Sequence, residues 1–263
     1  MGETALIIDT VTIGKRFNGP PQSANGGWTG GILARNLCLP TEQAGSVSYP
    51  SVSVSLRAPP PLDLALEVHR NPDASLSLKH QGLELARAQH EAFELDIPKP
   101  PRPAAASAAS AEGYQRGLGR ASWPYAKCFA CGVSREDGLC ITPSPVSDSN
   151  QAGVIAASWT PSAWLAETEG SLDGLVRLEA VWAALDCPAG IAWSFQLPDG
   201  APMVTARMSV SIMRLPRVNQ EIIVMGWPIE REGRKLYAGT ALMNAEGEVL
   251  ASSRHLWLLP KVD

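Results

Sequence analysis

The sequence has little charge, few aromatic side chains and no long apolar run, and each shortage excludes a class of protein. Charged residues make up 18% of the 263 residues, the net charge is -4 and no lysine or arginine cluster occurs, so we expect no nucleic-acid partner. No apolar run is long enough for a membrane span, and the first residues do not resemble a signal peptide. Five cysteines without an export signal predict free thiols and a cytoplasmic location.

Hydrophobic periodicity divides the rest of the chain into strands and helices. Alternating patterns predict strands at 5–13, 46–57, 62–69, 75–80, 83–95, 152–159, 203–214, 219–230, 234–244 and 248–259. An apolar helix is predicted over 28–39, where Gly30 and Gly31 lower helix propensity and require a close backbone contact in compensation. The fold class that follows is α+β, with helices packed on antiparallel strands.

A second helix, predicted over 171–190, is the segment around which the chain is organised. Apolar residues recur in it at three- and four-residue steps, residues 173–174 are expected to open it, and the Cys-Pro pair at 187–188 to close it. Asp186 lies in its last turn, where the helix dipole disfavours a carboxylate. Because local conflicts concentrate at functional sites, Asp186 is the first candidate; anchoring of the helix end is the alternative. Glu179, two turns earlier, is expected to be solvated.

An abrupt change of composition predicts the domain boundaries. Residues 97–113 are rich in proline, alanine and serine, which is typical of a linker. We therefore predict an N-terminal unit at 1–98, a linker at 99–122 and a C-terminal unit at 123–263.

The two predicted units resemble each other in sequence. Ser-Val-Ser-Leu at 53–56 matches Ser-Val-Ser-Ile at 209–212, and the offset of 156 is kept by the proline and the strand that follow. This repeat predicts an internal duplication in which two similar units pair within the chain as a pseudo-dimer; a homo-oligomer of the whole chain stays open.

Several segments resemble thioesterase-superfamily proteins. The run Cys128-Phe-Ala-Cys131-Gly, followed by Gly-Leu at 138–139, resembles the start of PaaI-type thioesterase-like domains. The helix segment WAALDCP at 182–188 resembles a thioesterase-superfamily helix, and the loop GPPQSANGG at 19–27 resembles the one that leads into a hotdog helix. The resemblance implies a double hotdog, with two tandem units that each pack a long helix on a curved antiparallel sheet.

The resemblance to TesB-type double-hotdog thioesterases also implies a catalytic site. An aspartate, a hydroxyl and a glutamine of that site fall on Asp186, on Ser209 or Ser211, and on His255, which departs from the glutamine. The implied activity is hydrolysis of an acyl-CoA or related thioester by water that Asp186 orients. Binding candidates, at loops and helix starts that offer N–H donors, are Asn25, Gly26, Gly27, Asp173 and Gly174. For each candidate an ordinary structural role is the competing interpretation.

Two further functions compete with hydrolysis. The histidine at position 255 favours a non-catalytic acyl or acyl-CoA binding protein of the same fold. A hotdog hydratase is the weaker alternative, because none of the four histidines has a nearby aspartate in the hydratase arrangement. The arginines that could bind CoA phosphates are scattered along the chain: Arg57, Arg70, Arg207, Arg214 and Arg217.

The cysteine spacing raises the question of a metal. Cys128 and Cys131, with Cys140 nearby, have the spacing of a thiolate zinc knuckle. A fourth ligand is not evident, since Cys187 belongs to the predicted helix and the histidines are distant in sequence. We therefore predict neither a metal nor a cofactor.

Overall fold

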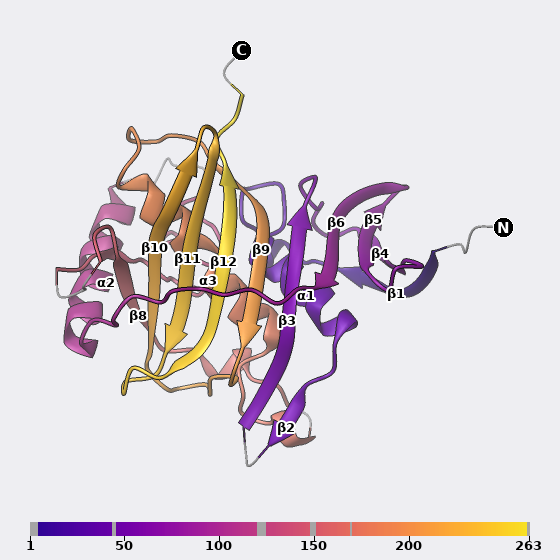
Figure 1. Ribbon diagram of the computed structural model, residues 1–263, viewed down its shortest axis with the longest axis horizontal. Helices are drawn as coiled ribbons and strands as arrows, with labels where there is room; N and C mark the ends of the chain where they lie inside the picture. Colours follow the sequence, from indigo (N-terminus) through magenta and orange to yellow (C-terminus); the bar gives the residue numbers. More distant parts are fainter. Residues whose placement is uncertain (1–4, 44–45, 120–124, 148–150, 169, 262–263) are drawn as a thin grey trace.

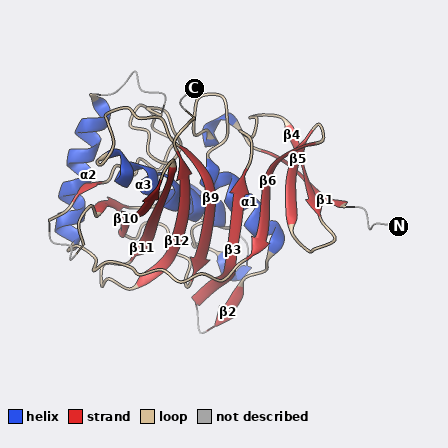
Figure 2. Cartoon of the chain, turned by 45° about the horizontal axis from the view of Figure 1, so that its top comes forward, coloured by secondary structure: helices blue, strands red, loops and turns tan. Residues whose placement is uncertain are grey.

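One antiparallel sheet wraps around two adjoining helices (Figures 1 and 2). The computed structural model describes residues 5–43, 46–119, 125–147, 151–168 and 170–261. Within this part of the chain, the strands are β1 (Leu6–Thr12), β2 (Thr41–Gln43), β3 (Ser46–Leu56), β4 (Ala65–Arg70), β5 (Leu76–His80), β6 (Leu83–His90), β7 (Ser144–Pro145), β8 (Ile155–Trp159), β9 (Val204–Ile212), β10 (Ile222–Glu232), β11 (Lys235–Met243) and β12 (Val249–Leu258). Each predicted strand has a counterpart within three residues at each end, except that the strand predicted over 83–95 ends at His90.

The helices are α1 (Gly26–Leu37), α2 (Pro103–Leu118) and α3 (Leu178–Ser194), with short 3-10 turns at Lys15–Phe17, Ala163–Leu165 and Gly170–Leu172. The strand order is β1-β4-β5-β6-β3-β9-β12-β11-β10-β8-β7, and β2 pairs with β3 alone. The strands of the first and second halves of the chain therefore meet in one continuous sheet, where β3 pairs with β9.

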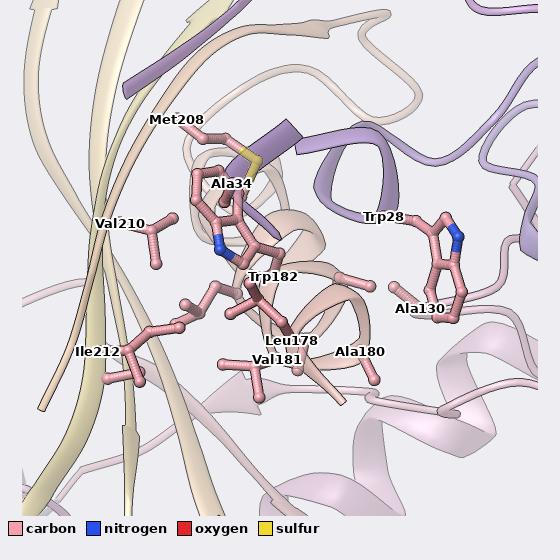
Figure 3. Packing of buried hydrophobic residues seen from close by; sticks show 14 of the residues in the cluster. Trp28, Ala34, Ala130, Leu178, Ala180, Val181, Trp182, Met208, Val210 and Ile212 are labelled. Atoms are coloured by element: carbon pink, nitrogen blue, oxygen red, sulfur yellow. The ribbon is translucent and has the colours of Figure 1, made fainter. Parts of the chain in front are cut away.

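Close packing between α1 and α3 explains the glycines of α1. A Cβ on Gly31 would lie 2.4 Å from the Cα of Glu179, and one on Gly30 would lie 2.5 Å from the Trp182 ring. These contacts confirm the backbone approach that the glycine-rich helix predicted. Trp182, Leu178 and Val181 then fill the space between α3 and the inner face of β9 (Figure 3).

The predicted bounds of the second helix are wrong at both ends. α3 begins at Leu178 after the N-cap residue Arg177, not at 173–174, and it continues past Pro188 to Ser194. Proline removes one helical hydrogen bond, but almost all of this helix is buried, and tertiary packing outweighs that loss. Gly226 of β10 allows the close fit, because a Cβ there would lie 2.5 Å from the Pro188 carbonyl oxygen.

The predicted linker contains a helix, α2, which was not predicted from the sequence. Ala106, Ala109 and Gly113 recur at helical spacing and face the protein, and the Cβ of any residue at 113 would lie 2.0 Å from the Thr142 carbonyl oxygen. The chain from 91 to 102 crosses the outer face of the sheet to reach α2 (Figure 1). Residues 120–122 of the predicted linker and 123–124 of the predicted second unit lie outside the described residues. No helix in the described part of the chain has the length and apolar character needed to cross a membrane.

Candidate active site

The Asp186 carboxylate is buried, with 3% of its surface exposed, where the middle of α3 meets the start of α1. Its Oδ2 accepts hydrogen bonds from the Gly27 N–H at 3.0 Å and from Asn25 Nδ2 at 3.2 Å. Its Oδ1 accepts from the Thr205 hydroxyl at 2.9 Å. Asn25 also caps α1, since its Oδ1 accepts from the Trp28 N–H at 2.9 Å. The carboxylate is therefore fixed in orientation and faces the positive end of the α1 dipole.

Burial sets the protonation behaviour of this carboxyl group. Removal from water raises the pKa of Asp186 from 3.8 to about 6, although the hydrogen bonds from Thr205, Gly27 and Asn25 each favour the charged form. Such a group can accept a proton from a nearby water molecule.

Asp186 borders a cavity of about 270 Å³. The polar residues of the lining include Asn25, Asp186 and Thr205, which are joined by hydrogen bonds to the Asp186 carboxylate. Apolar side chains form much of the remainder: Ala24, Leu56, Ile191, Met203, Val204 and Trp257. A cavity with a buried carboxylate and largely apolar walls suits a ligand that carries a hydrocarbon group and one polar reacting centre.

Comparison with known proteins identifies the fold. No family model and no curated protein matches the sequence. Among solved structures, a protein of unknown function with a hot dog fold from Alicyclobacillus acidocaldarius superposes with a TM-score of 0.60 at 12% identity, covering 99% of this chain and 97% of that one. The fold is the hotdog fold.

Other solved structures with this fold are thioesterases. Acyl-CoA thioesterase II TesB2 from Mycobacterium marinum has a TM-score of 0.59 at 10% identity and covers 99% of this chain and 97% of its own. The tesB protein MAP1729c from Mycobacterium avium subsp. paratuberculosis has a TM-score of 0.57 at 9% identity, covering 98% and 96%. The structural neighbours are therefore hotdog-fold thioesterases, and at these identities the likeness establishes the fold alone.

Thr205 is a site residue that sequence reasoning missed. The pairing of β9 with β12 skips one residue, since Leu256 lies opposite Arg207 and Trp257 lies opposite Thr205. This bulge reverses the inward-outward alternation along β9. Thr205 therefore reaches α3, although strict alternation would place its side chain on the same face of the sheet as that of Ser209. A single sequence gives no signal for a bulge at this position.

The two predicted serines lie elsewhere on β9. Ser209 donates a hydrogen bond to the Ser53 hydroxyl at 3.0 Å, at the junction of β3 and β9. The Ser211 hydroxyl lies 3.7 Å from the sulfur of Met213. Neither serine is among the described residues that line the cavity, so the structure does not bring them together with Asp186.

His255 is buried at 1% exposure on β12, where its Nε2 lies 2.9 Å from the Ser253 hydroxyl and 3.1 Å from the Thr240 hydroxyl. Burial lowers the pKa of His255 from 6.5 to about 3, so the ring is neutral at physiological pH. Among the described residues it does not line the cavity. Its contacts are those of a core histidine on the hotdog sheet.

The binding candidates divide into two groups. Asn25 and Gly26 line the cavity, and the Gly27 N–H contacts the carboxylate. Residues 173–174 lie in the loop before α3 and are not among the described lining residues; there the Gly174 N–H donates to the Glu167 carbonyl. Asp173 is therefore not a helix cap.

Glu179 is buried rather than solvated, which corrects the sequence interpretation. Its two carboxylate oxygens pair with Arg35 of α1, at 2.6 Å to Nε and 2.8 Å to a terminal nitrogen. Arg35 also pairs with Glu167. The ion pairs between Arg35 and Glu179 link α1 to α3, and neither residue is among the described residues that line the cavity.

Proposed function

We propose that this protein is an acyl-CoA thioesterase-like hydrolase in which Asp186 orients the attacking water. The observation that carries the proposal is the Asp186 carboxylate, which is held by three hydrogen bonds in the lining of a largely apolar cavity. Full-length structural likeness to a protein described as an acyl-CoA thioesterase II supports the same reaction class.

The proposed chemistry uses groups that already contact one another. Asp186 accepts a proton from a water molecule as its oxygen attacks the thioester carbonyl carbon, and the proton then passes to the departing thiolate. Thr205 keeps the carboxylate in position. The positive end of α1 polarises the carbonyl oxygen, on which negative charge develops.

The cavity lining supports an acyl-CoA substrate. The apolar walls accept the acyl group, and Arg57 on the cavity lining, with its side chain 53% exposed, offers a cation for a CoA phosphate. Arg57 is also paired with Glu84 at 2.7 Å, so phosphate binding would compete with an ion pair near the surface.

We also propose that the chain consists of two hotdog units related by internal duplication. The strand order β1-β4-β5-β6-β3 is matched in reverse by β9-β12-β11-β10-β8, as a two-fold axis at the β3–β9 junction requires. Ser53 lies directly opposite Ser209, its counterpart at the sequence offset of 156. In a duplicated protein, equivalent residues of paired equivalent strands meet at the axis.

A direct test measures release of free thiol from purified protein across acyl-CoA substrates of increasing chain length and with aromatic acyl groups. Hydrolysis of at least one class, absent from an Asp186→Asn preparation purified in the same way, is expected. Saturable acyl-CoA binding without turnover by the wild-type chain would contradict the proposal and indicate an acyl-binding protein. Intact-protein mass after rapid quenching should show no acyl adduct, because water attacks directly.

A further inference from the structure

Three cysteine sulfurs from separate parts of the chain converge beside the cavity. Cys128 and Cys131 come from the loop before β7, and Cys187 comes from the middle of α3. All three sulfur atoms lie within 4.8 Å of one another, and those of Cys128 and Cys187 are 3.6 Å apart. A tetrahedral ion with metal–sulfur bonds of about 2.3 Å separates its sulfur ligands by about 3.8 Å. The spacing of the three thiols therefore suits a single metal ion.

The loop that carries two of these thiols has the backbone arrangement of a thiolate knuckle. The loop forms a tight turn that brings the Cys128 and Cys131 sulfur atoms within 4.8 Å of each other. The Gly132 N–H donates to the Cys128 carbonyl at 2.8 Å, and a Cβ at 132 would lie 2.5 Å from that same oxygen. The tight turn therefore requires glycine directly after the second cysteine.

We propose that Cys128, Cys131 and Cys187 form a binding site for a thiophilic divalent cation, with Zn²⁺ as the best match to three thiolate ligands. Binding would release the thiol protons to solvent and form three metal–sulfur bonds. From the sequence we predicted no metal, because Cys187 lies in a helix 56 residues after Cys131. The fold nevertheless brings Cys187 beside the other two cysteines as the third ligand.

The surroundings suit such a site. All three cysteines line the cavity, so a fourth coordination position is accessible to water or to a ligand from that side. Asn25 Nδ2 lies 3.9 Å from the Cys128 sulfur, and the start of α1 places the positive end of its dipole near the thiolates. Asp186 is held by its own three hydrogen bonds, so the three thiols alone define the site.

The test titrates the reduced, chelator-treated full-length protein with Zn²⁺ against a chromophoric zinc chelator. We expect one Zn²⁺ per chain. Cys131→Ser and Cys187→Ser should each weaken binding by more than about 100-fold, the most that losing a residue bonded to a metal ligand usually costs. Cys140→Ser is the matched control, since Cys140 lies outside the cluster, and its affinity should equal that of the wild type.

Two further measurements, one of absorption and one of alkylation, depend neither on the folding of variants nor on hydrolysis. Co²⁺ bound to the wild-type chain should give thiolate-to-metal charge-transfer absorption and the intense d–d bands of a tetrahedral site. Zn²⁺ should protect Cys128, Cys131 and Cys187, but not Cys140, from alkylation. Less than stoichiometric binding by the fully reduced wild-type chain, or equal affinity in folded Cys131→Ser and Cys187→Ser variants, would overturn the proposal.

Discussion

The Thr205 hydroxyl donates to Asp186 across 2.9 Å, whereas Ser209, on the same strand, is bonded to Ser53 instead. If Asp186 orients water, removing the Thr205 hydroxyl should affect catalysis and removing the Ser209 hydroxyl should not. We expect Thr205→Val to lower kcat about tenfold, since a hydrogen bond to a charged group is worth roughly 1.5 kcal/mol or more. Steady-state kinetics with one acyl-CoA substrate checks this, with Ser209→Ala as the control. Equal kcat values in the two variants would refute the assignment of Thr205.

The contact between α1 and α3 should tolerate no side chain at position 31. Gly31→Ala gains about 1 kcal/mol of helix propensity, but its Cβ would lie 2.4 Å from the Glu179 Cα, in a layer that cannot expand. We expect a net loss of about 1–3 kcal/mol in the free energy of unfolding, measured by urea denaturation. Gly14→Ala is the control, because its Cβ meets only an Asp63 oxygen at 4.0 Å; a stabilised Gly31→Ala protein would mean that the helices are further apart.

The buried ring of His255 predicts how stability depends on pH. Its pKa is lowered from 6.5 to about 3, so the unfolded chain binds a proton that the folded chain excludes. The contribution of His255 is fully present above about pH 6.5 and declines at up to about 1.4 kcal/mol per pH unit as the pH falls toward 3. Because other groups titrate in this window, the informative quantity is the difference between the wild type and His255→Gln. Parallel pH profiles for the two proteins would show that His255 is accessible to protons in the folded state.

Substitution of Arg57 should show whether this residue contacts the CoA part or the acyl part of the substrate. We expect Arg57→Ala to raise KM for acyl-CoA about three- to tenfold at low salt, through loss of one charge-assisted bond, and to leave kcat unchanged. KM for the same acyl group on a small thiol that lacks phosphates should not change. Glu84→Gln, which frees Arg57 from its ion pair, is the control and should not raise KM. A rise of equal size with both substrates would assign Arg57 to the acyl end of the cavity.

Sequence periodicity was sufficient to predict the main strands and the approximate positions of α1 and α3. Alternating apolar residues on β3 and β9 reflect one buried sheet face, and this physical constraint is local. The glycines of α1 also predicted a close contact, which proved to be with α3. Asp186 was found because a carboxylate among apolar residues late in a helix is locally unfavourable, although α3 continues for two further turns beyond it.

The remaining features depend on contacts between distant residues. Pro188 ends a helix by local rules, but burial on all sides keeps α3 intact. The bulge in β9 that brings Thr205 to Asp186 arises from pairing with β12. Cys187 lies next to Cys128 in the fold but 59 residues away in the sequence, and a spacing of this length does not predict a metal site. Alanine-rich composition at 103–118 is compatible with both a linker and a helix, and packing against β8 selects the helix.

The most direct measurement is the single-turnover rate of acyl-CoA cleavage by Asp186→Asn, paired with the Kd of a non-hydrolysable thioether analogue. Asparagine keeps the shape of the side chain and removes the charge that accepts the proton from water. We expect the rate constant of cleavage to fall at least about 100-fold while Kd stays within about threefold of the wild-type value. An unchanged cleavage rate in a folded Asp186→Asn protein that still binds the analogue would contradict a role for this carboxylate in orienting water.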